Sequence, residues 1–245
     1  MVSSATEKRT AVAGALRQPG EIESMFDQIV GRYDLMNRLM TGGMDIRWRR
    51  EAARAAIGDG AVRVLDLATG TGDLALELAH QGVPQVVGAD FSSEMLRAAN
   101  RKRADHHETR IQLTRGDAMH LPFADGTFDA VTVAFGLRNM PDYSGAIVEM
   151  TRVLAPGGRL VILEMTPLQR PLFSRVASLY ADRVIPFIGG LISGDRDAYG
   201  YLPRSVNAFP PAGELAIMMR RAGLSVVRYR LFNLGTVAMH RGVKR

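Results

Sequence analysis

The sequence contains no cysteine. A chain without thiols forms no disulfide bond, no thiolate zinc site and no iron–sulfur cluster of its own. It also has no cysteine nucleophile. The five histidines do not offer a metal site either, because His106 and His107 are adjacent, His80 and His120 are scattered, and no cluster of ligands accompanies them. We therefore expect no metal.

Long hydrophobic runs are also missing. The longest candidate, "VIPFIGGLI" from Val184 to Ile192, is interrupted by proline and glycine and is far shorter than the roughly 20 residues of a membrane span. Near the N-terminus, "AVAGAL" follows Lys8 and Arg9 but is too short for the apolar region of a signal peptide. We expect a cytoplasmic protein whose residues 1–19 form a flexible tail that ends at Pro19-Gly20.

The composition is that of a globular protein. The chain has 245 residues, of which 47% are hydrophobic and 23% charged, so it can bury a full core in one domain, here residues 20–245. Lys and Arg number 31 against 25 Asp and Glu, a formal net charge of +6. This charge suits nucleic acid, an anionic lipid surface or an anionic substrate, and does not choose among them.

From Val62 onward, short apolar β-rich runs alternate with helical segments, beginning with "VRVLDL", "GDLALELAHQG" and "PQVVGAD". Such alternation predicts stacked βαβ units, hence an α/β Rossmann-like fold with a mainly parallel sheet and helices on both faces. The two final β-rich runs, "LSVVRYRLF" and "GTVAMHRGVK", predict an antiparallel pair at the end of the sheet.

Two segments stand outside this alternation. Residues 20–60 form a predicted helical cap, with two helices in residues 21–57 around the break "TGGMD", and residues 168–206 form a predicted helical lid insertion. Both would lie over the carboxyl edge of the sheet, where open α/β folds bind ligands.

A glycine-rich turn in "VLDLATGTGD", Val64 to Asp73, joins a strand to a helix. Gly70 and Gly72 allow the backbone to approach a ligand, at which the free amides of the following helix also point. The turn satisfies the dinucleotide pattern G-x-G-x-x-A, and Asp90 follows about 20 residues later. NAD is therefore a rival cofactor.

Three features favour S-adenosylmethionine over NAD. Asp66 precedes Gly70 in the pattern D-x-A-x-G-x-G, typical of S-adenosylmethionine enzymes except that Ala68 replaces their first glycine; its carboxylate would attract the methionine ammonium and repel a pyrophosphate. Asp73 at the helix N-terminus is a second poor neighbour for pyrophosphate.

The third feature is the pair of sequences at the ends of the next two predicted strands. Asp117-Ala118 in "GDAMHLPF" resembles the methyltransferase element that contacts adenine, and Asp90 would hold the ribose hydroxyls. Asp90 could instead cap the helix that follows it, and Asp117 could be a turn residue. Thr71 is a further candidate donor to the cofactor, or it bonds within its own loop.

The methyl acceptor is not predicted to be nucleic acid. Methylation of pyrimidine C5 normally needs a cysteine that adds to the ring, and base amino methyltransferases carry an Asn/Asp-Pro-Pro-aromatic run after the fourth strand, where this chain has "AFGLRN".

Longer motifs carry a specific resemblance. "FDQIVGRYDLMNRLMTGGMDIRW", "FGLRNMPD", "RVLAPGGRLVILEMT", "YLPRSVNAFP" and "GTVAMHRGVK" resemble the demethylmenaquinone and 2-polyprenyl-6-methoxybenzoquinol C-methyltransferase family of quinone biosynthesis, over roughly residues 22 to 244. The resemblance implies a seven-stranded fold that uses S-adenosylmethionine to methylate a ring carbon of a prenylated hydroquinone. It also implies that Thr71, Asp90, Asp117 and Ala118 bind the cofactor.

The chain departs from the family pattern at several positions. Ala134 stands where the family often has serine, which removes a hydroxyl from the cofactor side, and Thr41 and Asp45 stand where it often has serine and histidine.

The chemistry that the resemblance implies needs donors beside a ring oxygen, because only the hydroquinone, best as a phenolate, has a nucleophilic ring carbon. Arg138 and Asn139 are the first candidates, the arginine to stabilise the phenolate and the amide to orient the ring; otherwise they form a salt bridge and a turn cap. Tyr33, Asp34 and Asn37 are second candidates, and the base would be Asp34 or a water.

A prenylated substrate suggests a role for the insertion. Residues 168–192, with Arg170, Arg175 and Arg183, would contact an anionic membrane surface, or would serve as an ordinary lid or a homodimer contact.

We favour demethylmenaquinol as substrate. The alternatives are the benzoquinol precursor of ubiquinone, another acceptor methylated on oxygen or nitrogen, an NAD-dependent oxidoreductase, and a binding module that keeps the fold.

Overall fold

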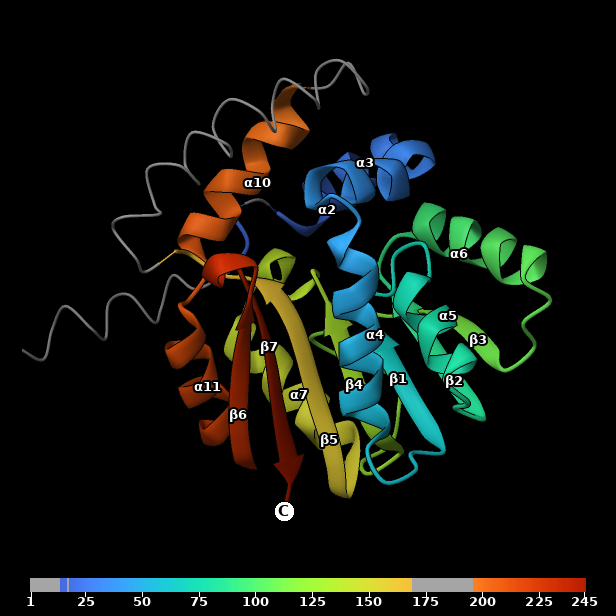
Figure 1. Ribbon diagram of the computed structural model, residues 1–245, viewed down its shortest axis with the longest axis vertical. Helices are drawn as coiled ribbons and strands as arrows, with labels where there is room; N and C mark the ends of the chain where they lie inside the picture. The colour runs from blue at the N-terminus through green and yellow to red at the C-terminus, as the bar shows by residue number, and fades with distance from the viewer. Residues whose placement is uncertain (1–13, 17, 169–195) are drawn as a thin grey trace, which may run out of the picture.

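The computed structural model describes residues 14–16, 18–168 and 196–245 and has at its centre a seven-stranded sheet of order β3-β2-β1-β4-β5-β7-β6 (Figure 1). The strands are β1 (Arg63–Leu67), β2 (Gln85–Asp90), β3 (Ile111–Arg115), β4 (Phe128–Ala134), β5 (Leu154–Met165), β6 (Leu224–Phe232) and β7 (Val237–Lys244). Neighbours from β3 to β5 are parallel, whereas β7 is antiparallel to both β5 and β6. The predicted fold class and the antiparallel C-terminal pair are thus confirmed.

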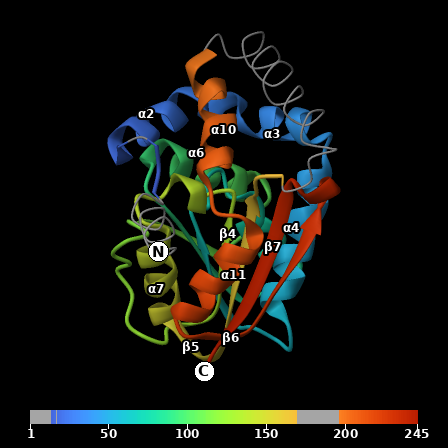
Figure 2. The same ribbon diagram turned by 90° about the vertical axis from the view of Figure 1, so that its left-hand side faces the viewer.

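Helices cover both faces of the sheet. Helices α4 (Met44–Ile57) and α5 (Asp73–His80) pack on one face, α7 (Tyr143–Val153) and α11 (Ala212–Arg221) on the other, and α6 (Ser93–Asp105) contacts β2 and β3 (Figure 2). Several boundaries follow the local sequence signals. The Ser92 hydroxyl caps α6 by accepting from the Met95 amide at 3.0 Å, and α5 begins at Asp73 directly after the glycine-rich turn.

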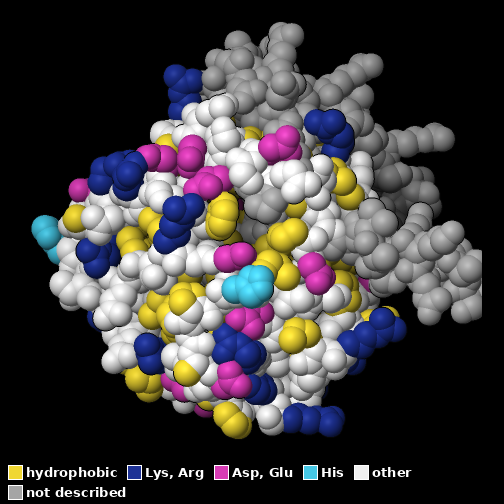
Figure 3. All heavy atoms as spheres, turned by 180° about the vertical axis from the view of Figure 1, so that it is seen from behind, with side chains coloured by type: hydrophobic (Ala, Val, Ile, Leu, Met, Phe, Trp, Pro, Cys, Tyr) yellow, Lys and Arg dark blue, Asp and Glu magenta, His cyan; other side chains and the backbone are white. Residues whose placement is uncertain are grey.

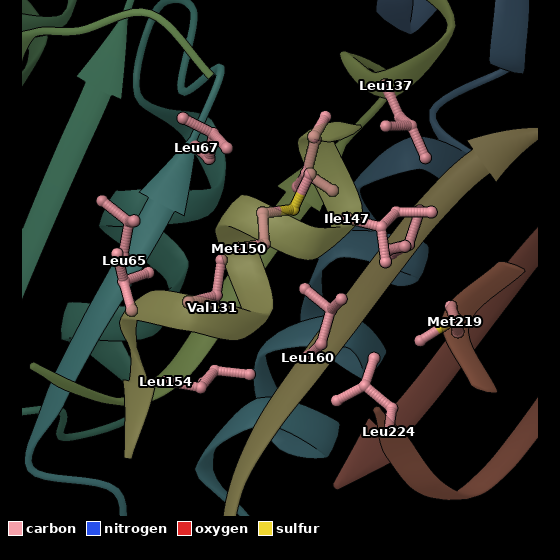
Figure 4. Packing of buried hydrophobic residues seen from close by; sticks show 14 of the residues in the cluster. Leu65, Leu67, Val131, Leu137, Ile147, Met150, Leu154, Leu160, Met219 and Leu224 are labelled. Atoms are coloured by element: carbon pink, nitrogen blue, oxygen red, sulfur yellow. The ribbon is translucent and has the colours of Figure 1, made fainter. Parts of the chain in front are cut away.

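The larger core lies between the sheet and α7 (Figure 4). Leu65, Val131 and Leu160 point from three neighbouring strands toward Ile147 and Met150 of α7, and all five are fully buried. Burial of each such side chain stabilises the fold by roughly 1.5–3 kcal/mol. Because this packing fixes the strands side by side, their carboxyl ends form one fixed edge above the core.

Above that edge lie α2 (Pro19–Ile29), the 3₁₀ turn η1 (Val30–Arg32), α3 (Tyr33–Thr41) and α10 (Arg196–Ala208) (Figure 1). Met25, Met36 and Tyr201 are buried together in a small core of their own, which joins α2, α3 and α10. We call α2, η1 and α3 the cap.

The prediction of two helices in residues 21–57 was wrong, because three α-helices, α2, α3 and α4, occupy this part of the chain. The break at "TGGMD" is present, since Gly42 and Gly43 have φ angles of +58° and +76°, but the first predicted helix is split into α2 and α3. Gly31 in η1 is a weak helix former, and Arg32 leaves helical geometry with φ −120° and ψ 0°. The split turns α3 so that Tyr33 begins a new helix over the strand ends.

Of the predicted lid insertion, only residues 168 and 196–206 belong to the described chain. The segment expected at a membrane surface, apart from residue 168, and most of the predicted tail lie outside the described residues. No helix of the described part is long and apolar enough to span a membrane. The described residues also contain the 3₁₀ turns η2 (Leu137–Asn139), after β4, and η4 (Asn233–Gly235), between β6 and β7. Acidic and basic side chains are interspersed on the face shown in Figure 3.

Candidate functional site

A cleft with about 930 Å³ of empty space opens between the cap and the carboxyl ends of β1, β2 and β4. Five residues predicted to hold the cofactor line it, and they lie at or just after the ends of four different strands: Gly70, Asp90, Asp117, Ala118 and Ala134. Tyr33 and Asn139, predicted to serve the acceptor, line it as well. The parallel sheet thus brings together residues far apart in the sequence at one edge.

The glycine-rich turn forms part of the cleft wall and packs tightly against η2. A Cβ added at Gly136 would lie 2.5 Å from the Cβ of Ala68, which leaves no room for a side chain. Ala68 itself has a φ of +53° and Gly70 a φ of +57°, a conformation that favours glycine. The backbone therefore runs close to the cleft without side chains that would fill it.

Asp90 joins the turn to the next loop. One carboxylate oxygen accepts from the Gly70 amide at 2.7 Å and the other from the Ser92 amide at 2.9 Å. Burial raises the pKa of Asp90, although these amide bonds oppose the rise. A carboxylate has about four acceptor positions, so these bonds leave acceptor capacity for a ligand in the cleft.

Three of the predicted cofactor residues do not line the cleft. Asp66 is buried beneath the turn, where it accepts from the hydroxyls of Thr69 at 2.6 Å and Thr132 at 2.8 Å. Burial raises the pKa of Asp66 to about 6 despite these two bonds. Thr71 is buried and donates to Asp34 at 2.6 Å, and Gly72 is the N-cap of α5.

Asp117 and Ala118 follow β3 at the open side of the cleft. The Asp117 carboxylate accepts from the Met119 amide at 2.9 Å, which is the turn role considered from the sequence. This side chain remains half exposed, and Ala118 packs against the main core. The turn bond and a place beside a ligand are therefore compatible.

Arg138 lies in η2 with its guanidinium directed into the protein. Its Nη1 donates to the Glu164 carboxylate and to the carbonyl of Phe135, each at 2.6 Å. Although burial disfavours the charge, Glu164 raises the pKa of Arg138. Its buried Nε has no hydrogen-bond partner within the part of the chain that the structure describes. Arg138 thus forms a salt bridge with the end of β5, and it does not itself line the cleft.

Asn139 lines the cleft, and its side-chain oxygen accepts from the Tyr201 hydroxyl at 3.2 Å. This bond joins η2 to α10. It also fixes the orientation of the Asn139 amide, because an oxygen engaged in this way leaves the NH₂ group as the free end. Tyr201 was not predicted as a site residue.

Tyr33 closes the cleft from the cap side. Its ring packs edge-on against Phe26 at 6.0 Å, and its hydroxyl is hydrogen-bonded to the side chain of Asn37. Burial raises the pKa of Tyr33 above its ordinary value, so the hydroxyl stays protonated at neutral pH and can donate. Asp34, by contrast, does not line the cleft and is bound to Thr71 and Lys102.

The sequence also did not identify the apolar walls, which include Ile22, Phe26, Phe91, Met95 and Phe135. Phe91 directly follows the strand-end Asp90, so its place was within reach of the same reasoning. The others depend on packing between distant elements.

The lining fits S-adenosylmethionine. Within the described residues, the lining contains Glu23, Asp90 and Asp117 but no lysine or arginine, which suits a cationic cofactor and disfavours a pyrophosphate. Apolar walls suit an adenine ring, and a carboxylate at the end of β2 suits ribose hydroxyls. Among the described residues, no group of three or more metal-ligating side chains is present.

Comparison with known proteins identifies close relatives. The family model for the ubiE/COQ5 methyltransferase family matches residues 15–244. A demethylmenaquinone methyltransferase of Thermus thermophilus is 52% identical over 219 residues, covering 89% of this chain and 99% of the relative. A protein of the same name from Deinococcus radiodurans is 47% identical, covering 98% and 99%. The ubiquinone/menaquinone biosynthesis C-methyltransferase UbiE of Desulfotalea psychrophila is 47% identical, covering 92% and 91%.

Solved structures share the fold at low identity. The [4+2]-cyclase SpnF has a TM-score of 0.71 at 20% identity, covering 95% of this chain and 98% of its own. A SAM-dependent methyltransferase from Thermotoga maritima has a TM-score of 0.64 at 19% identity, covering 91% and 99%. A cyclase and a methyltransferase on one fold show that function must be inferred from the site.

Proposed function

This chain belongs to the ubiE/COQ5 methyltransferase family, and from that premise we propose that it methylates a ring carbon of a reduced prenylated quinone, demethylmenaquinol in particular. It is an S-adenosylmethionine-dependent methyltransferase. The observation that carries the proposal is a cleft whose described lining is acidic, with no lysine or arginine, and is bordered by Asn139 and Tyr33 at the acceptor side. The names of the relatives from Thermus and Deinococcus favour the naphthoquinol over the benzoquinol.

When bound, S-adenosylmethionine supplies a methyl group already activated on a sulfonium. The protein then has to align this methyl group with the ring carbon and exclude water. We assign the ribose hydroxyls to Asp90, the adenine to the walls near Phe91, Asp117 and Ala118, and the rim beside the methyl group to Ala134. Asp66 and Thr71 would act from behind the wall, by fixing the glycine-rich turn.

The acceptor ring must carry negative charge at one oxygen for its carbon to react. The Asn139 amide and the Tyr33 hydroxyl are donors on the cleft surface, and they would bind the ring oxygens. Arg138 would contribute its positive field from beneath η2, reduced by its pairing with Glu164. Because Asp34 is occupied by Thr71 and Lys102, water is the better candidate for the proton acceptor.

The prenyl chain makes a membrane surface a suitable place for the reaction. We propose that the protein acts in the cytoplasm at the inner membrane surface, that residues 20–245 form one domain with a cap and lid, and that residues 168–192 approach anionic lipid. Co-sedimentation with vesicles with and without anionic lipid tests this, and equal binding to both would remove the electrostatic contribution. Light scattering at several concentrations tests a homodimer.

The decisive experiment uses the purified protein, methyl-labelled S-adenosylmethionine and a short-chain demethylmenaquinol kept reduced by dithionite. We expect a mass gain of one methyl group and a label on a ring carbon by NMR. The corresponding benzoquinol serves as the competing substrate. A label on oxygen, or cofactor binding without any methylation of either quinol, would contradict the proposal.

A further inference from the structure

A cluster of charged residues outside the cleft connects the cap to the rest of the protein. Its members are three acids and three bases on four helices: Asp34 and Arg38 of α3, Asp45 and Arg49 of α4, Asp73 of α5 and Lys102 of α6. The charges therefore balance within the cluster. None of the six lines the cleft, and the proposed chemistry uses none of them.

Lys102 joins parts of the cluster that are far apart in the sequence. Its ammonium lies 2.6 Å from Asp34, 3.0 Å from the Thr71 hydroxyl and 2.7 Å from Asp73. These acceptors belong to the cap, the glycine-rich turn and the start of α5. An ammonium has three donors, so one side chain satisfies all of them at once. We call Lys102, Asp34, Thr71 and Asp73 the clamp.

The rest of the cluster supports the clamp from behind. Asp73 also lies 3.0 Å from Arg38 and 3.7 Å from Arg49, while the buried Asp45 pairs with both of these arginines. Although burial pushes the pKa of Asp73 upward, Arg49 and Lys102 hold it below its ordinary value. Asp73 therefore stays ionised, and without Lys102 it would face the Asp34 carboxylate as a like charge.

The clamp acts on the cleft through the residue next to Asp34. Tyr33 begins α3 and closes the cleft above the glycine-rich turn, its ring 3.9 Å from where a Cβ of Gly70 would stand. The other end of the cap, α2, is held separately. Asp27 accepts from the Ser92 hydroxyl at 2.5 Å, and Glu23 accepts from the Arg115 guanidinium at 3.1 Å. The clamp ties the Tyr33 end of the cap directly to the turn, and Arg38, farther along α3, adds a second tie through Asp73.

We propose that Lys102 is a positioning residue that holds Tyr33 over the bound cofactor by bridging Asp34 of the cap to Thr71 and Asp73. Asp34 and Thr71 thus serve the site through each other and through Lys102 rather than by touching a ligand. The inference rests on the methyltransferase assignment for its ligand, but not on which quinol is the acceptor.

The test is cofactor binding by Lys102→Met, with Arg97→Met as the matched control. Arg97 lies on the same helix, is 64% exposed and pairs only with Glu94 among the described residues. Calorimetry with S-adenosylhomocysteine should show affinity about tenfold weaker for Lys102→Met, a change of about 1.4 kcal/mol, and no change for Arg97→Met. Lys102→Arg, which keeps the charge, should recover most of the affinity.

Two further measurements distinguish positioning from a general loss of stability. Hydrogen exchange should accelerate in residues 19–41 of Lys102→Met and remain unchanged in α7 and α11. Asp34→Asn should weaken binding by itself, and in the double variant with Lys102→Met the two losses should not add, because both break the same bridge.

Equal affinity of Lys102→Met and Arg97→Met for S-adenosylhomocysteine would overturn the inference, as would additive losses in the double variant. If Lys102→Met does not fold, Asp34→Asn with unchanged affinity would overturn it equally. Failure of the quinol assay with normal cofactor binding would count against the substrate and leave the clamp intact.

Discussion

The guanidinium of Arg138 and the carboxylate of Glu164 lie 2.6 Å apart, with both side chains at least nine-tenths buried. Glu164 also accepts from the Arg138 backbone amide at 3.2 Å and from the Met165 amide at 2.8 Å. One carboxylate at the end of β5 thus fixes both the backbone of η2 and the side chain of its arginine. The position of Asn139 on the cleft follows from that attachment.

Removal of one partner should destabilise the fold strongly. Arg138→Met leaves Glu164 as an unpaired buried charge, for which we expect a loss of roughly 3–5 kcal/mol in the free energy of unfolding by urea. Arg138→Met combined with Glu164→Gln should recover a large part of this loss. An equal or greater loss in the double variant would show that the pair is not what holds η2. Because an Arg138 variant can lose activity simply by unfolding, its turnover has to be measured where the variant is folded.

The contact between η2 and the glycine-rich turn should be sensitive to a single methyl group. Gly136→Ala would place its Cβ 2.5 Å from that of Ala68, and we expect a loss of roughly 1–3 kcal/mol in stability together with weaker binding of S-adenosylhomocysteine. Ala68→Gly removes the opposing methyl group and the positive φ penalty, so it should rescue Gly136→Ala. Thermal unfolding and calorimetry of the four proteins of this cycle measure both effects; a Gly136→Ala that Ala68→Gly cannot rescue would exclude this contact as the cause.

Tyr33 should contribute to turnover more than to cofactor binding. Tyr33→Phe keeps the ring that packs against Phe26 and removes the hydroxyl that can donate to the substrate. We expect kcat to fall by about tenfold, equivalent to about 1.4 kcal/mol of transition-state stabilisation, with unchanged affinity for S-adenosylhomocysteine. Tyr229→Phe is the matched control, because Tyr229 is an exposed tyrosine of β6 that does not line the cleft. Equal kcat for both variants would remove the hydroxyl from the mechanism.

Asp66 should make stability depend on pH. Its pKa rises from an ordinary 3.8 to about 6 in the folded protein, so the folded state binds more protons than the unfolded state between these values. The contribution of Asp66 to the free energy of unfolding is therefore fully present below about pH 4 and is lost as pH rises to about 6. The loss is roughly 3 kcal/mol, since each unit of pKa difference corresponds to about 1.36 kcal/mol.

Asp66→Asn tests this, because the amide cannot ionise. Relative to the wild type, the variant should gain stability as pH rises from 4 to 6, with a constant difference above that range. Urea unfolding of both proteins at each pH gives the difference between their free energies of unfolding. The contributions of other titrating groups cancel in this difference, because both proteins contain them. A difference that does not change with pH would place the titration elsewhere.

The strand ends were predictable because parallel strands end at the same edge. Each acidic or small residue directly after an apolar run, such as Asp90, Asp117 or Ala134, therefore had to approach the others. The mainly parallel sheet followed from the alternation of apolar runs and helices, and its antiparallel end followed from the two final β-rich runs. Ser92, whose hydroxyl caps α6, is the kind of local signal that marks a helix start in a sequence.

Side-chain direction was not predictable in the same way. Asp66 is held beneath the turn by Thr132, which is 66 residues away, and Thr71 is turned from the cleft by Asp34, 37 residues away. Nothing local distinguishes these residues from Asp90, which faces the cleft. The small core that joins α2 and α3 likewise includes Tyr201, a residue of a distant helix.

The place of β7 in the sheet constrains how the protein is assembled during synthesis. β7 follows all other strands in the sequence, yet it lies between β5 and β6 and pairs with both. Until the ribosome has released residues 237–244, β5 has an unpaired edge and β6 has no partner in the sheet. An exposed edge of this kind can pair with another chain, so we expect nascent chains stopped before β7 to be the form most prone to aggregation and most dependent on chaperones.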